Sequence, residues 1–131
     1  RGEEAADMVT CLNTGHEGSL STGHSNSAED MLARLETMIL MGMTIPLEAI
    51  RRQIASGIDI LVHLGRLRDG SRKILEVVEL LAYEEGRFVM NPLYRFAEQG
   101  VDAEGRIMGE LRKEGVLVQD KKLRAAGLQI C

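Results

Sequence analysis

The sequence has few aromatic residues: its 131 residues include two tyrosines, two phenylalanines and no tryptophan. A core must therefore be built mainly from aliphatic side chains and from methionine, which occurs seven times. At this length the chain is one domain or part of one, and it is long enough to bury a core.

Cysteine is also scarce, and no long apolar run is present. The two cysteines, Cys11 and Cys131, cannot form a framework of disulfides, which favours a reducing cytosol. No segment approaches the roughly 20 apolar residues that a membrane-spanning helix requires. No signal peptide is visible, although this absence carries no weight in a chain that begins with Arg1. Any attachment to a membrane is expected to come through partners.

Basic residues are outnumbered, and one nucleotide-binding motif is missing. The chain has 16 Lys and Arg against 20 Asp and Glu, so its net charge is −4 and its pI is about 5.4. A dedicated nucleic-acid-binding protein needs a basic face, so that class is disfavoured. The phosphate-binding loop G-x-x-x-x-G-K-S/T does not occur in the sequence.

Two histidines in small, polar surroundings are the most informative feature that is present. His16 and His24 lie close together in sequence, and glycines flank both, at positions 15, 18 and 23. Three interpretations are open: exposed turn residues, metal ligands, or groups that contact an anionic ligand together with backbone N–H groups. Metal binding is poorly supported, because no C-x-x-C, H-x-x-x-H or H-x-H spacing occurs.

The first half of the chain is expected to be mainly helical. The pattern predicts a helix over residues 3–14, a short strand over 19–22 and helices over 28–41 and 44–57. Ser27 is placed to cap the second of these helices, and Pro46 fits the first turn of the third. Two helices joined by a short turn also fit a DNA-reading helix-turn-helix that carries Arg51 and Arg52, an alternative that the charge balance opposes.

The second half is expected to be a β-meander with strands over residues 58–67, 73–81 and 87–90. Asp69 and Gly70 are the expected two-residue hairpin turn. Arg66, Arg68 and Arg72 cluster around this turn, either as a solvated surface or as contacts to a nucleotide or a neighbouring subunit. After Asn91 the pattern predicts an irregular segment, a strand-like stretch over 107–118 and a helix over 120–126.

Several of these segments resemble type II/IV secretion ATPases, most closely the CpaF branch that powers Flp-type pilus assembly. Residues 14–27 match that family's histidine box, TGHxGSLxTxHxNS. The one departure from the usual pattern in the box is Ser25, where alanine is commoner. Residues 34–38, 50–56 and 65–72 resemble later signatures in the family's order. The resemblance covers nearly the whole chain and weakens from about Gly100.

The resemblance implies an α/β fold, namely the C-terminal half of a RecA-like P-loop ATPase domain with an antiparallel hairpin extension. The chain, residues 1–131, would start just after the Walker B strand, with Arg1 as the tail of the Gly-Glu-x-Arg-Gly motif. The intact parent is expected to be a hexameric ATPase that powers pilus assembly or protein secretion. It would be cytoplasmic, peripheral to the inner face of the cell membrane, and would engage an inner-membrane secretion platform protein.

The resemblance also implies roles toward ATP and Mg²⁺. His16 and His24 are expected to sense the γ-phosphate and to couple its loss to movement of the ring. Gly15 and Asn26 are expected to lie near the nucleotide, with Arg66 and Arg68 as further candidate contacts. No residue is expected to bind a metal directly. The chain alone is expected to be inactive and to self-associate through an unpaired sheet edge beside residues 19–22.

Overall fold

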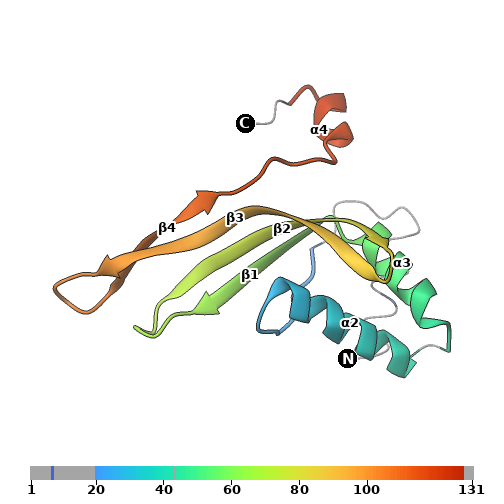
Figure 1. Ribbon diagram of the computed structural model, residues 1–131, viewed down its shortest axis with the longest axis horizontal. Helices are drawn as coiled ribbons and strands as arrows, with labels where there is room; N and C mark the ends of the chain where they lie inside the picture. The colour runs from blue at the N-terminus through green and yellow to red at the C-terminus, as the bar shows by residue number, and fades with distance from the viewer. Residues whose placement is uncertain (1–6, 8–19, 43, 129–131) are drawn as a thin grey trace. The chain divides into compact units, whose positions relative to one another are not determined.

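The computed structural model describes Asp7 and residues 20–42 and 44–128. The elements whose bounds are described, shown in Figure 1, are α2 (Ala28–Gly42), α3 (Leu47–Gly57), β1 (Ile60–Arg66), β2 (Arg72–Glu84), β3 (Arg87–Val101), β4 (Ile107–Lys113) and α4 (Lys121–Ala125). The chain divides into two compact units. The helical unit runs to Asp59 and includes Leu80–Val89, and the sheet unit comprises residues 60–79 and 90–131.

The helical unit is built on the apolar faces of α2 and α3, which contact each other. Leu32, Leu35 and Ile39 recur at helical spacing along α2 and are buried. Ile50 and Ile54, one turn apart on α3, are fully buried. Both helices lie within a few residues of their predicted bounds, and the predicted aliphatic core is confirmed.

A polar cluster around Arg51 joins three elements of the helical unit. The Arg51 guanidinium lies 3.0 Å from a carboxylate oxygen of Glu36 on α2. It also donates to the Tyr83 hydroxyl of β2 at 3.1 Å, and that hydroxyl donates to Glu48 of α3 at 2.8 Å. Hydrogen bonds to Glu36 and Tyr83 raise the pKa of Arg51. Arg51 is therefore engaged within this unit, which does not fit the DNA contact considered for it.

The four strands form one sheet in the order β1-β2-β3-β4, so each strand neighbours the next one in sequence. In the sheet unit, β1 pairs antiparallel with β2 from Ile60 opposite Glu79 to Arg66 opposite Arg72. β3 pairs antiparallel with β4 from Tyr94 opposite Lys113 to Val101 opposite Ile107. The predicted meander is confirmed, with β4 as a further strand.

Two details of the predicted strands are wrong. The hairpin turn is longer than two residues, because Leu67 N donates to Ser71 O at 2.8 Å and the Asp69 side chain accepts from Ser71. Gly70 supplies the positive φ that this turn needs. The stretch after Asn91 is not irregular: β3 continues through Pro92 to Val101. The missing N–H of one proline is outweighed by the pairing of residues 94–101 with β4.

The α/β fold class is confirmed, as helices combined with a four-stranded antiparallel sheet. The strand predicted over 19–22 does not form in its described part, because residues 20–25 are neither strand nor helix and Leu20 is almost fully exposed. The predicted helix over 3–14 lies outside the described residues except for Asp7, which is helical. None of the helices in the described part has both the length and the apolarity to span a bilayer.

Candidate functional site before helix α2

The structure describes four of the residues predicted to act at a nucleotide: His24, Asn26, Arg66 and Arg68. The other three, Arg1, Gly15 and His16, lie outside the described residues. His24 and Asn26 belong to the helical unit, whereas the two arginines belong to the sheet unit.

The segment that carries His24 and Asn26 is fastened to the first turn of α2. The Asp30 N–H donates to Ser27 Oγ at 3.0 Å, which makes Ser27 the predicted N-cap. In return, the Asn26 N–H donates to the Asp30 carboxylate at 3.1 Å. The hydrogen bond from Asn26, with a further contribution from Arg34, lowers the pKa of Asp30. Ser25 Oγ donates to the carbonyl oxygen of Ser27 at 2.9 Å and completes the turn.

His24 is exposed just before this cap. The preceding Gly23 lies close to the Met31 side chain, since a Cβ at position 23 would come 2.6 Å from the Met31 methyl group. This contact holds the backbone beside His24 against α2 and leaves the imidazole open to a ligand. An exposed imidazole on a turn held by an N-cap is suited to contact an anionic ligand.

The N-terminus of α2 is not itself a vacant anion site. A helix N-terminus carries partial positive charge, but here Glu29 and Asp30 occupy the first turn. These two carboxylates compensate the helix dipole and would repel a phosphate. A phosphate approaching this segment is therefore expected to meet His24 rather than the helix end.

Arg66 and Arg68 differ in what they contact at the β1–β2 hairpin. The Arg68 guanidinium forms an ion pair with Glu98 of β3, which raises the pKa of Arg68. Arg66 is exposed, and its Nε donates to the carbonyl oxygen of Gly70 at 3.3 Å. Arg66 is thus the freer of the two for a ligand. Their predicted contact with a nucleotide stays a prediction.

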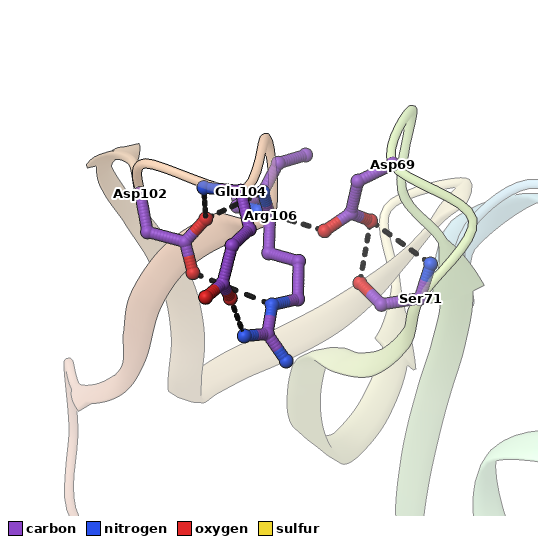
Figure 2. Close-up of polar contacts among 6 residues, drawn as sticks. Asp69, Ser71, Asp102, Glu104 and Arg106 are labelled. Atoms are coloured by element: carbon purple, nitrogen blue, oxygen red, sulfur yellow. Dashed lines mark hydrogen bonds and ion pairs between the residues drawn. The ribbon is translucent and has the colours of Figure 1, made fainter.

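Sequence reasoning placed Asp69 in the first hairpin turn but missed that Asp69 links this turn to the first residue of β4 (Figure 2). One carboxylate oxygen accepts from the N–H and the hydroxyl of Ser71, at 2.9 and 2.6 Å. The other accepts from the N–H of Ile107 at 2.7 Å. The Ser71 hydroxyl and the two backbone N–H groups lower the pKa of Asp69 to about 2. An Asp-Gly-Ser turn signals the first contact, but nothing local signals the partner on β4.

The second hairpin turn in Figure 2 is organised by Asp102 in a similar way. Its carboxylate accepts from the N–H groups of Glu104 and Arg106 at 3.0 and 2.8 Å. Arg106 also pairs with the carboxylates of Asp102 and Glu104. The acidic groups here are occupied by the turn itself. No group of three or more His, Cys, Asp or Glu side chains suited to a metal occurs among the described residues.

Glu79 of β2 is a second residue that the sequence does not single out, and it is only 1% exposed. Its carboxylate accepts from the N–H groups of Val118 and Gln119 at 2.8 and 2.9 Å, and from the Asn91 amide at 3.0 Å. Burial raises the pKa of Glu79, but these three hydrogen bonds together bring it below its usual value. Glu79 fastens the segment after β4 to the sheet.

Comparison with known proteins places the chain among secretion proteins. The model of a family described as Type II/IV secretion system protein matches residues 1–115. The type IV secretion system protein VirB11 of Brucella suis biovar 1 (strain 1330) is 38% identical over 82 residues, which cover 59% of this chain and 23% of VirB11.

Two conjugal transfer proteins are also similar to the chain. The provisionally named conjugal transfer protein MT3759 of Mycobacterium tuberculosis (strain CDC 1551 / Oshkosh) is 37% identical over 87 residues, which cover 66% of this chain and 24% of that protein. Conjugal transfer protein TrbB of Rhizobium radiobacter is 28% identical over 88 residues, which cover 67% of this chain and 26% of TrbB. The chain spans about a quarter of the length of these relatives.

Proposed function

Because the chain belongs to the type II/IV secretion system protein family, we propose that it is part of an ATP-hydrolysing motor that drives a secretion or conjugal-transfer system. The observation that carries this proposal is the family match, which covers residues 1–115. The names of VirB11 and TrbB agree with it. The family match also favours this interpretation over a helix-turn-helix DNA-binding protein.

Within that motor, His16 and His24 are proposed to contact the terminal phosphate of ATP. The support for His24 is its exposed imidazole on a segment fixed by the Ser27 cap, which positions a hydrogen-bonding group without blocking it. Neither histidine has to act as a general base, because a positioned polar group is sufficient to stabilise charge on a phosphate. Asn26 would hold the loop, as its backbone bond to Asp30 does here.

The chain's own residues fit phosphate contact better than they fit the other parts of an ATP site. Bound Mg²⁺ would neutralise phosphate charge during hydrolysis. The described residues offer no cluster for Mg²⁺, and the sequence holds no P-loop. The Mg²⁺ ligands and the phosphate-binding loop are therefore assigned to other parts of the motor. We expect the 131-residue chain alone to have no ATPase activity.

The finer assignment is to the CpaF branch and thus to Flp-type pilus assembly. It rests on the match of residues 14–27 to the histidine box and on the order of the later signatures. The relatives' names indicate type IV secretion and conjugal transfer instead. Deletion of the parent gene, followed by parallel assays of pilus assembly and of conjugation, separates the two assignments. A hexameric parent at the inner face of the cell membrane, engaged with a platform protein, belongs to the same proposal.

The experiment that tests the phosphate role is the substitution His24→Ala in the full-length motor. Turnover of ATP should fall by more than about tenfold while the dissociation constant for ATP stays unchanged, because the contact is made most strongly in the transition state. Ser21→Ala is the matched control, since Ser21 is also exposed on residues 20–25 and falls at a variable position of the histidine box. Unchanged turnover in His24→Ala would make His24 an ordinary turn residue.

A further inference from the structure

Strand β1 is an edge of the sheet that lacks the usual protection. Exposed edge strands normally carry lysines or other charged residues, or prolines, and these prevent pairing with another chain. From Ile60 to Gly65 the sequence of β1 is Ile-Leu-Val-His-Leu-Gly, and its one basic residue, Arg66, comes last. The opposite edge, β4, has Glu110, Arg112 and Lys113 within seven residues.

One face of β1 is also an exposed apolar stripe. Ile60, Val62 and Leu64 point to the same face, and they are 40%, 50% and 64% exposed. The stripe continues onto β2, because Leu64 lies opposite Ile74, which is 40% exposed. An edge strand with free apolar side chains at alternate positions is suited to the addition of another extended segment.

A pair of like charges lies at the end of this stripe. Arg66 and Arg72 are directly opposite each other on β1 and β2, which is destabilising unless an anion compensates them. Both are exposed, and neither forms an ion pair with any residue in the described part of the chain.

The other pair of opposed arginines in the sheet unit is compensated. Arg95 and Arg112 lie opposite each other on β3 and β4, and each has a carboxylate partner. Arg95 lies 3.9 Å from Glu114, and Arg112 lies 3.2 Å from Glu110. Of these two opposed arginine pairs, the pair of Arg66 and Arg72 is the one without carboxylate partners among the described residues.

We propose that the β1 edge, defined by Ile60, Val62, Leu64, Ile74, Arg66 and Arg72, binds an extended segment of a partner protein with alternating apolar side chains and a terminal carboxylate pair. The segment adds to β1 as a strand, its apolar side chains cover the stripe, and its carboxylates face Arg66 and, one strand further away, Arg72. A second copy that pairs through its own β1 does not satisfy the arginines, because β1 contains no carboxylate. Nucleic acid is disfavoured by the net charge of −4.

The test measures binding of a short fluorescent peptide of alternating valine and threonine that ends in two glutamates, by anisotropy with the 131-residue chain. A peptide with glutamines in place of the glutamates is the ligand control. We expect the glutamine peptide to bind about tenfold more weakly, and Val62→Lys and Arg72→Glu each to weaken binding of the glutamate peptide by about tenfold. Met108→Lys, at a similarly exposed apolar residue of β4, is the protein control and should bind normally.

Three results would overturn the proposal. Equal binding of the two peptides would remove the role of the arginines. Displacement of the glutamate peptide by Mg-ATP from the wild-type chain, but not from Arg72→Glu, would assign the arginines to a nucleotide. Light scattering that shows a dimer of the wild-type chain, a monomer of Val62→Lys and no peptide binding would make a second copy the occupant. None of these results depends on the phosphate role of His24, so the two proposals can fail separately.

Discussion

The two edge strands of the sheet, β1 and β4, are equally long but differ in how they are protected and held. β4 carries charges of both signs and is followed by a segment that Glu79 binds. β1 carries an apolar stripe and an uncompensated arginine. Among the described residues, β4 is protected by the chain's own charges, whereas β1 leaves apolar side chains exposed and Arg66 without an ion pair, as the proposed partner would require.

Each edge strand contains a glycine, and replacing these glycines gives the largest expected effect. A Cβ at Gly109 of β4 would lie 2.5 Å from the carbonyl oxygen of Ala97 and from the Phe96 ring. Because a paired backbone cannot move away, Gly109→Ala should lower the free energy of unfolding by about 2–3 kcal/mol. A Cβ at Gly65 of β1 would meet mainly the end of the Leu75 side chain, which can rotate, so Gly65→Ala should cost about 1 kcal/mol.

Urea unfolding followed by circular dichroism measures both effects. Equal losses in the two variants would mean that β4 is no more tightly fitted to its neighbour than β1. That result would contradict the difference described between the two edges.

The next largest effect tests how the chain after β4 is held. Glu79→Gln replaces one acceptor oxygen by an NH₂ group that faces backbone donors, so the free energy of unfolding should fall by about 2 kcal/mol. The segment with Val118 and Gln119 should then become sensitive to proteases. Glu84→Gln, at an exposed residue of the same strand, is the control for loss of charge. Unchanged protease resistance in Glu79→Gln would show that the buried carboxylate does not fasten this segment.

The smallest effect concerns Asp69, which links the β1–β2 turn to the first residue of β4. Its pKa is about 2 in the folded chain and about 4 when unfolded. The ionised carboxylate therefore stabilises the fold above pH 4, and this contribution is lost as the pH falls from about 4 to about 2. In Asp69→Asn, the urea midpoint should change less with pH over this range than in the wild type. If the urea midpoints of the two proteins changed equally with pH, Asp69 would not contribute to the loss of stability in acid.

The sequence predicted α2 and α3 of the helical unit, because the signals for these helices are local. Apolar spacing located both helices, and Ser27 marked the start of α2. Each signal acts over one or two helical turns and needs no distant partner. The strand predicted over 19–22 failed in its described part, residues 20–22, for the converse reason: alternation over four residues is a weak signal without a paired strand.

The sheet unit was harder to predict because its decisive bonds join distant residues. Asp69 and Ile107 are 38 positions apart, and Glu79 is 39 positions from Val118. β3 continues past Pro92 to Val101, and residues 107–113 return to pair with it. A prediction that weighs each segment separately does not include these partners.

The candidate site was predictable in part. The order of the family's motifs predicts His24 and Asn26 as site residues, which stays a prediction, and the structure shows the cap that follows them. Periodicity alone did not separate Arg66 from Arg68, since the ion pair of Arg68 with Glu98 depends on how β3 lies in the sheet.

Glu79 also bears on where a shortened version of this domain should end. The family match ends at residue 115, but two of the three donors to Glu79 come from residues 118 and 119. A protein shortened to the matched range would keep a buried carboxylate and remove most of its partners. The boundary drawn by sequence similarity thus falls inside a physical unit, and the smallest stable version of this domain must extend at least to Gln119.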